Sequence, residues 1–131
     1  MFKIRYAYIP FVLILLLTGC NFGTKTYPIT GTVNYDGQPL AKGMITLTPD
    51  GTKGNSGKSS MAEIKNGSFS IPKKFGVGGG AYRIFVESVE SLGDDAGSKE
   101  LFPTFSMDYQ FQEGTNPPPL TIDIPKSVKK K

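Results

Sequence analysis

Short runs of alternating apolar and polar residues, separated by turn residues, make up most of this chain after Thr26. Alternation with a period of two is typical of a half-buried β-strand, because successive side chains of a strand point to opposite faces of the sheet. No long stretch shows the 3.6-residue repeat of an amphipathic helix. The pattern therefore favours an all-β fold.

Six to seven short strands are expected, and each has one apolar face. The predicted strands cover residues 27–35, 43–49, 59–65, 68–71, 81–89, 109–112 and 120–124. Their inward-facing residues are predicted to be Ile29, Val33, Tyr35, Ile45, Leu47, Met61 or Ala62, Ile64, Phe69, Ile71, Tyr82, Ile84, Val86, Leu120, Ile122 and Ile124. An antiparallel sandwich of two sheets, as in Ig-like domains, is the natural way to bury these faces.

Two dipeptides predict the tightest turns of this fold. Asp36-Gly37 follows the first strand, and Asn66-Gly67 separates the third from the fourth. Both central residues of a type I′ turn need positive φ, which these residue types tolerate. Longer polar loops are expected at residues 50–58, 72–80 and 91–106.

The first 19 residues have the features of a secretory signal peptide. Lys3 and Arg5 make the start of the chain basic, residues 7–17 are mostly apolar, and two small residues follow. The apolar segment is shorter than the roughly 20 residues that a membrane-spanning helix needs. We therefore expect residues 1–19 to be removed on export.

The only cysteine stands directly after this segment, in the sequence Leu17-Thr18-Gly19-Cys20. These four residues resemble the lipobox of bacterial lipoproteins, in which diacylglycerol is attached to the nucleophilic cysteine sulfur. The resemblance implies a lipid anchor on Cys20 and signal cleavage between Gly19 and Cys20. The next residue, Asn21, is not the aspartate that retains many enteric lipoproteins in the inner membrane. We therefore expect the outer membrane or the cell surface.

These features divide the chain into four parts. Residues 1–19 are the signal peptide, 20–26 the lipidated cysteine and a polar tether, 27–125 the β-sandwich domain, and 126–131 a basic tail. The 131 residues less the 19 of the signal leave 112, which suffice for one domain with its own core. That core cannot rely on a disulfide, because the one cysteine carries the lipid.

Three runs of the sequence are similar to one domain family. Residues 31–49, with Gly-Gln-Pro-Leu inside them, residues 62–72, with Asn-Gly-Ser-Phe, and residues 80–86, with Gly-Ala-Tyr, follow its pattern. They resemble carboxypeptidase-regulatory-like, or transthyretin-like, domains. This resemblance implies a seven-stranded β-sandwich that serves as an accessory module without catalytic residues. The segment 90–112 has no counterpart in the family.

Composition excludes several functions. Nine basic and eleven acidic residues lie between Lys25 and Pro125, so the body has a net charge of −2, which argues against nucleic-acid binding. The chain has no histidine, and its only thiol is committed to lipid, which removes most nucleophilic and acid–base sites. We expect neither an enzyme nor a cofactor.

Two local patterns suggest a ligand site but lack the residue spacing that such a site requires. Gly57-Lys58-Ser59 has no glycine at the position that a P-loop requires, and a strand, not a helix, is predicted after it. The acidic residues of segment 87–100 lack the regular spacing of a calcium loop. We therefore predict no nucleotide site and no metal site.

The remaining candidates are four aromatic residues, Phe102, Phe105, Tyr109 and Phe111. Exposed rings could stack on sugars or cover a partner protein, whereas buried rings would close one end of the sandwich. Residue type favours burial. We expect a lipid-anchored envelope protein with a structural or protein-interaction role, and the alternative is a surface module that binds carbohydrate. Its partners would be the membrane, through Cys20, and envelope proteins or cell-surface glycans.

Overall fold

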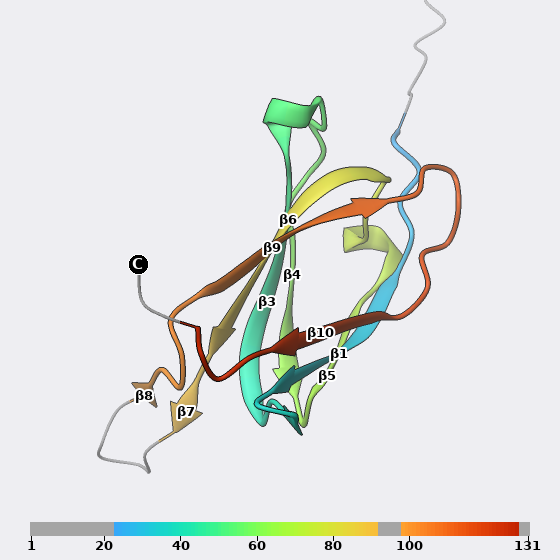
Figure 1. Ribbon diagram of the computed structural model, residues 1–131. Coiled ribbons are helices and arrows are strands. Elements are labelled where there is room, and N and C mark those ends of the chain that lie inside the picture. The colour runs from blue at the N-terminus through green and yellow to red at the C-terminus, as the bar shows by residue number, and fades with distance from the viewer. Residues whose placement is uncertain (1–22, 92–97, 129–131) are drawn as a thin grey trace, which may run out of the picture.

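The computed structural model describes residues 23–91 and 98–128, and its regular secondary structure consists of strands apart from two short 3-10 turns (Figure 1). In chain order the elements are β1 (Ile29–Tyr35), β2 (Gln38–Pro39), β3 (Lys42–Pro49), η1 (Gly51–Lys53), β4 (Ser60–Lys65), β5 (Ser68–Ile71), η2 (Lys73–Phe75), β6 (Gly80–Ser88), β7 (Glu90–Ser91), β8 (Ser98–Lys99), β9 (Phe105–Phe111) and β10 (Leu120–Ile124). The two short η elements are single 3-10 turns. The expected all-β class is therefore confirmed.

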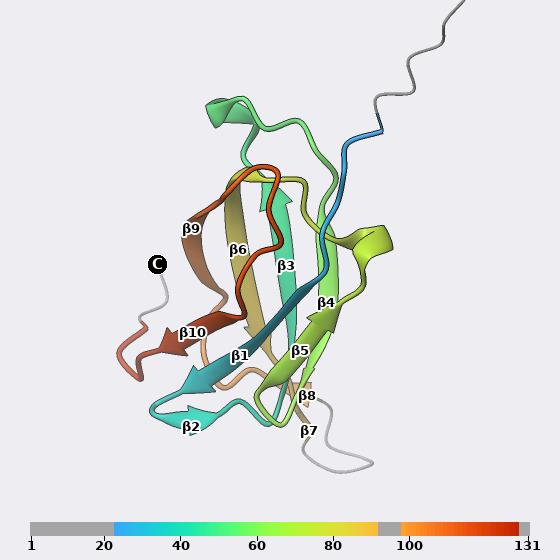
Figure 2. The same cartoon turned by 90° about the vertical axis from the view of Figure 1, so that its right-hand side faces the viewer.

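The main sheet is mostly antiparallel and follows the order β10-β1-β5-β4-β3-β6-β9, with β2 paired to β1. Strands β4 and β5 pair at a single position, Lys65 with Ser68, and then diverge. The sheet curls at this point, so that β10, β1 and β5 lie on one side and β4, β3, β6 and β9 on the other (Figure 2). The curl encloses the core.

The core consists of the apolar faces of the strands, as the alternation predicts. Its side chains include Ile29, Val33, Leu40, Ile45, Leu47, Ile64, Phe69, Ile71, Val77, Tyr82, Ile84, Val86, Phe102, Phe111, Leu120, Ile122 and Ile124. Of the two residues considered for the buried face of β4, Ala62 packs against this core, while Met61 is 66% exposed. Tyr35 is only partly buried.

Both predicted tight turns are present. Asp36 and Gly37 have φ of 52° and 76°, and Asn66 and Gly67 have φ of 49° and 75°. Positive φ at both central residues is the requirement of a type I′ turn, whose twist matches that of the flanking strands. These turns set the register of β1 with β2 and of β4 with β5.

Three details of the predicted strand pattern were wrong. The expected strand 109–112 begins earlier, at Phe105, because apolar and polar residues already alternate from that position. The expected loop 91–106 contains the short hairpin of β7 and β8. The last strand, β10, pairs with β1 in parallel, so the sheet is not purely antiparallel.

Several expectations concern residues that the structure does not describe. The signal peptide 1–19, the lipobox Leu17 to Cys20 and the last three residues of the tail lie outside the described ranges. Within residues 23–91 and 98–128, no helix has the length and apolar character needed to cross a membrane. The tether is described from Gly23 onward.

Candidate functional site

The chain enters the folded body at one end of the curled sheet, which we call the tether end. Strand directions assign to it residues 23–28, 49–60, 71–80 and 111–119. Both views show the N-terminal segment and the η1 loop at this end, with the hairpins β1–β2 and β4–β5 at the other (Figures 1 and 2). The opposite end is formed by residues 35–42, 65–68, 87–91, 98–105 and 124–128.

A hollow of about 660 Å³ lies in the tether end. Four separate segments line it, and they contribute Gly23, Thr24, Thr26, Gly54, Asn55, Ser56, Gly57, Lys58, Ser59, Ser60, Lys74, Phe75, Gly76, Gly78, Gly79, Tyr82 and Glu113. Most of these residues are small or polar. The hollow therefore presents backbone groups and hydroxyls, together with two lysines, the carboxylate of Glu113 and the rings of Phe75 and Tyr82.

The tether is bound to one wall of this hollow. Tyr27 and Val77 form an antiparallel bridge, with N···O distances of 2.9 and 3.0 Å, and the Thr26 hydroxyl donates to the Lys73 carbonyl at 2.7 Å. Gly76 lies under this crossing, where an added Cβ would overlap the Tyr27 carbonyl oxygen. Only glycine leaves room for the tether at this point.

Asn55 connects two of the other segments that line the hollow. Its side-chain amide donates to the carbonyl oxygens of Ala81, at 2.8 Å, and Gly79, at 3.2 Å, while its Oδ1 accepts from the Gly57 backbone at 3.2 Å. One side chain thus connects the η1 loop to the start of β6. These bonds hold the hollow open without any apolar core of its own.

The tether end is rich in lysine, and two of its lysines line the hollow. The tether end contains Lys25, Lys53, Lys58, Lys73 and Lys74, all exposed, and only two acidic residues, Asp50 and Glu113. Lys53 forms ion pairs with Asp50 and Asp108, at 3.7 and 3.5 Å. Among the described residues, the other four lysines form no ion pair. Their charge is therefore open to solvent.

Phe75 stands among these lysines with 58% of its surface exposed. The ammonium group of Lys74 lies 5.3 Å from the centre of its ring, within the range of a cation–π contact. Lys25 makes a similar contact with Tyr27 at 5.5 Å. The surface at this end thus combines unpaired positive charge with an exposed aromatic ring.

A charge network lies beside the tether end on the outer face of β6 and β9. Arg83 and Asp108 are cross-strand partners, and the Arg83 Nε donates to Asp108 Oδ1 at 2.9 Å. This hydrogen bond, together with the charges of Arg83 and Lys53, lowers the pKa of Asp108. The pKa of Asp50 is lowered chiefly by its hydrogen bond from the Thr52 hydroxyl, at 2.6 Å. Both carboxylates have cationic and hydrogen-bonding partners, as in a structural network, although Asp50 Oδ2 is buried and accepts no hydrogen bond.

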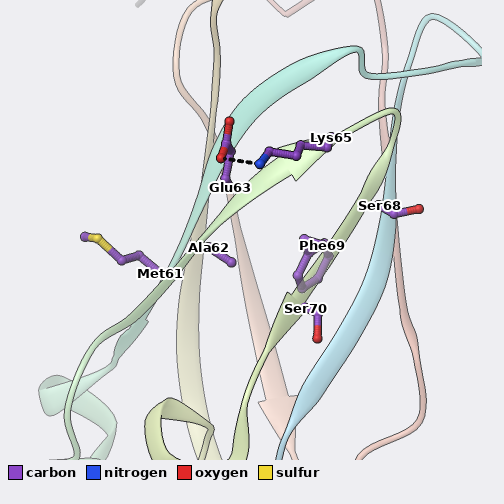
Figure 3. Close-up of a pocket in the computed structure, with 7 residues that line it drawn as sticks. All are labelled: Met61, Ala62, Glu63, Lys65, Ser68, Phe69 and Ser70. Carbon is purple, nitrogen blue, oxygen red and sulfur yellow. Dashed lines mark ion pairs between the residues drawn. The ribbon is translucent and has the colours of Figure 1, made fainter.

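A second, shallower depression of about 480 Å³ lies where β4 and β5 diverge (Figure 3). Figure 3 shows Glu63 and Lys65 turned toward each other, and their charged atoms are 3.0 Å apart. Ala62 and Phe69 line it from the facing strands. Its one carboxylate is held in an ion pair, so the depression offers a surface but no converging reactive groups.

The main sheet ends at β9. This strand is seven residues long and pairs only with β6, leaving its outer edge without a strand partner in the part of the chain that the structure describes. Figure 2 shows β9 at the margin of the sheet. The strand contains no lysine and no proline, the residues that commonly protect such edges.

The four aromatic candidates do not form a row of exposed rings. Phe102 and Phe111 are buried, with 4% and 2% of their surfaces exposed, and burial is confirmed for these two. Phe105 and Tyr109 are partly buried on the inner face of β9 and pack against the core. The edge of the Phe111 ring meets Tyr82 at a centroid distance of 5.3 Å.

Sequence reasoning missed the lysines of the tether end. Lys25, Lys58 and the pair Lys73-Lys74 are far apart in the sequence, and no charge run reveals them. The signal that could have located them is positional, because each lies in a loop at the same end of the predicted strands. No group of three acidic, histidine or cysteine side chains suited to a metal occurs within the described ranges.

Comparison of the chain with models of protein families, with curated proteins and with solved structures finds no match in any of the three. The resemblance to transthyretin-like domains therefore stays a prediction from residues 31–49, 62–72 and 80–86. What the protein does has to be argued from its own surfaces.

Proposed function

We propose that the protein is a lipid-anchored component of a bacterial cell envelope, in which a non-catalytic β domain binds another protein. The anchor would be diacylglycerol on Cys20, as the sequence Leu17 to Cys20 predicts. The described chain is consistent in layout, since Gly23 to Tyr27 run along one end of the body and the strands begin only at Ile29. A short tether would thus connect the lipid on Cys20 directly to the domain.

We further propose that the curled sheet is a sandwich of the transthyretin-like kind. Support comes from the single β4–β5 pair, after which the two groups of strands share one apolar core. Support also comes from Gly37, Gly67 and Tyr82, which occupy two turns and a core position as the family pattern expects. Domains of this kind act as accessory modules, which fits binding better than catalysis.

The free edge of β9 is the observation that carries the binding role. An edge strand points half of its backbone N–H and C=O groups away from the sheet, where an extended segment of a partner can pair with them. Natural edges are commonly short or carry lysine or proline. Strand β9 is long and has neither, so it is a suitable template for an added strand.

Hydrogen bonds identify the outward residues of β9. Asp50 N donates to Ala81 O, and Val89 N donates to Lys42 O, so the odd-numbered residues of β6 face β3. The even-numbered residues of β6 therefore face β9, where they pair with Phe105, Met107, Tyr109 and Phe111. The alternate residues, Ser106, Asp108 and Gln110, must then point their backbone groups outward.

Charge favours a different protein over a second copy of this chain. If two β9 strands paired antiparallel about their midpoint, Asp108 would lie opposite its own copy. Like charges directly opposite each other destabilise a strand pair. A partner strand with a lysine, an arginine or a neutral residue at that place would avoid the conflict.

The binding role is tested at Ser106, whose backbone N–H points outward. Ser106→Pro removes that donor from the free edge and leaves the β6–β9 ladder intact. In the full chain, expressed in its bacterium with a photo-crosslinking residue at Gln110, we expect Ser106→Pro to reduce a discrete crosslinked product about tenfold. Ser106→Ala, which keeps the N–H, should retain it. Equal yields from both variants would contradict binding through the strand edge.

The anchor is tested separately at Cys20. Cells that express the full chain are labelled with radioactive palmitate and fractionated, and the experiment is repeated with Cys20→Ala. We expect label on the wild-type protein in membranes and none on the variant. Unlabelled wild-type protein in the medium would contradict the anchor.

A further inference from the structure

We propose that the tether end is a docking surface for anionic lipid headgroups, formed by Lys25, Lys58, Lys73, Lys74 and the ring of Phe75. The inference rests on the proposed lipid anchor, because the anchor brings this end to the bilayer. It adds a second contact with the membrane, through the folded body itself. The body would then lie against the membrane in one orientation.

Chain length places this end at the membrane surface. Gly23 lines the hollow of the tether end, and three peptide units separate it from Cys20. Three units span at most about 11 Å. A lipid on Cys20 would therefore hold the hollow within about one Debye length of the headgroups at an ionic strength of 0.1 M.

The charge of this end suits anionic lipids. Four of its five lysines have no ion-pair partner among the described residues. Lysines near an anionic surface each contribute about a fivefold gain in partitioning. Both Lys58 and Lys74 line the hollow, so headgroup phosphates could approach them beside the tether.

The opposite end differs in its balance of positive and negative charge. There Lys65 and Lys126 are paired with Glu63 at 3.0 Å and Asp36 at 3.5 Å, while Lys42 is exposed and has no ion pair among the described residues. Further exposed acids, Glu87, Glu100 and Asp123, lie toward this end. The tether end has five lysines and two acidic residues, so a net positive charge lies where the anchor would be.

Phe75 supplies the apolar part of the contact. Its ring is 58% exposed at the tip of the η2 turn, with Lys73 and Lys74 immediately before it. Basic residues beside an exposed aromatic ring are typical of surfaces that bind at the membrane interface. The ring would enter the headgroup region when the lysines bind phosphate.

The test uses the chain from residue 20 to Lys131 with Cys20→Ser, so that no acyl chain contributes. This chain contains the folded body, since every strand that the structure describes and every fully buried apolar side chain lies between Ile29 and Ile124. It is mixed with vesicles of phosphatidylglycerol and phosphatidylcholine, or of phosphatidylcholine alone. We expect binding to the anionic vesicles only, with release as salt rises from 0.1 to about 0.5 M.

Two matched triple variants locate the binding surface. Lys58→Gln, Lys73→Gln and Lys74→Gln together should reduce partitioning about a hundredfold. Lys42→Gln, Lys65→Gln and Lys126→Gln change the net charge equally at the opposite end and should have little effect. Equal losses in the two triple variants would overturn the inference, as would equal binding of the starting chain to both kinds of vesicle.

Phe75 gives a second and independent readout. Because the chain has no tryptophan, Phe75→Trp introduces the only tryptophan, whose emission can be excited selectively, at the docking surface. Its emission should shift to shorter wavelength with anionic vesicles and be quenched by brominated lipid. Leu101→Trp, at a 40% exposed position of the opposite end, is the control and should not respond. Unchanged emission from the Phe75→Trp variant would overturn the inference.

Failure of docking and failure of the anchor give different results. Loss of the palmitate label on Cys20 would contradict the anchor, and it is measured in cells on the full chain. The vesicle measurements use a chain without lipid and report only on the lysines and Phe75. A labelled protein whose unlipidated form ignores phosphatidylglycerol would overturn docking alone.

Discussion

Gly76 shows how a single residue can determine where the tether joins the body. Its backbone is extended, with φ of −75°, so its conformation is open to any residue. Space is the constraint, because the Tyr27 carbonyl carbon would lie 2.5 Å from an added Cβ and the oxygen closer still. The Tyr27–Val77 bridge depends on this close approach.

We predict that Gly76→Ala lowers the free energy of unfolding by about 3 kcal/mol, the upper range for overpacking at a rigid site. The methyl group must displace the backbone of the tether, which cannot move without losing the bridge. Urea unfolding followed by circular dichroism measures the loss. Gly51→Ala is the control, because an added Cβ there meets nothing within 4 Å, and its effect should stay within about 0.5 kcal/mol.

Residue types predicted the turns but not the crossing at Gly76. Asn66-Gly67 is a local signal, since the residues that need positive φ are the turn itself. Gly76 is required because of Tyr27, which lies 49 positions earlier in the sequence. A steric constraint between such distant residues leaves no pattern in a single sequence.

At the scale of elements, the local sequence patterns predicted the strands but not which distant strands pair with each other. The alternation of Leu120, Ile122 and Ile124 identified β10 and its buried face correctly. It carried no information on the partner or direction, and β10 joined β1 in parallel. Strand β9 was predicted too short because residues 91–106 were assigned to a loop, whereas the strand already begins at Phe105. Its central Asp108 accepts a hydrogen bond from Arg83 on β6.

The network around β9 predicts a loss of stability in acid. The pKa of Asp108 is lowered in the folded protein by the hydrogen bond and charge of Arg83, and that of Asp50 chiefly by the Thr52 hydroxyl. A carboxyl group with a lowered pKa stabilises the fold above its ordinary value of 3.8. That contribution is lost as the pH falls through the lowered pKa.

We therefore expect the unfolding free energy of the wild type to fall between about pH 5 and pH 2, and to fall less steeply in Asp108→Asn and Asp50→Asn. Urea titrations at successive pH values measure the slopes. Ser106→Ala, which leaves every charge in place, should keep the wild-type slope. A slope in Asp108→Asn equal to that of the wild type would show that the Arg83 contact does not stabilise the fold.

At the scale of the whole molecule, composition concealed the distribution of charge. A body with nine basic and eleven acidic residues reads as mildly acidic, which is correct as an average. The fold gathers five lysines at the tether end and pairs Lys65 and Lys126 with acids elsewhere. Topology decides which loops share an end, so the docking surface could be recognised only after the strand order was known.

The curl of the sheet also predicts how the molecule unfolds. Strands β4 and β5 are hydrogen-bonded at one residue pair, yet side chains from both sides of the curl contribute to a single core. Removing core volume on one side should therefore destabilise both. Ile122 on β10 is 1% exposed, and Ile122→Ala should lower the free energy of unfolding by about 3 kcal/mol.

Cooperativity is the more informative part of this prediction. Far-ultraviolet circular dichroism follows all strands, whereas the tryptophan fluorescence of a Phe75→Trp background reports on the η2 loop, beside β5 and β6. We expect both probes to give the same transition midpoint, shifted equally by Ile122→Ala, with Thr121→Ala, an exposed neighbour, as the control. Two separate transitions would mean that the two sides of the curl fold independently, and that the core between them does not join them into one unit.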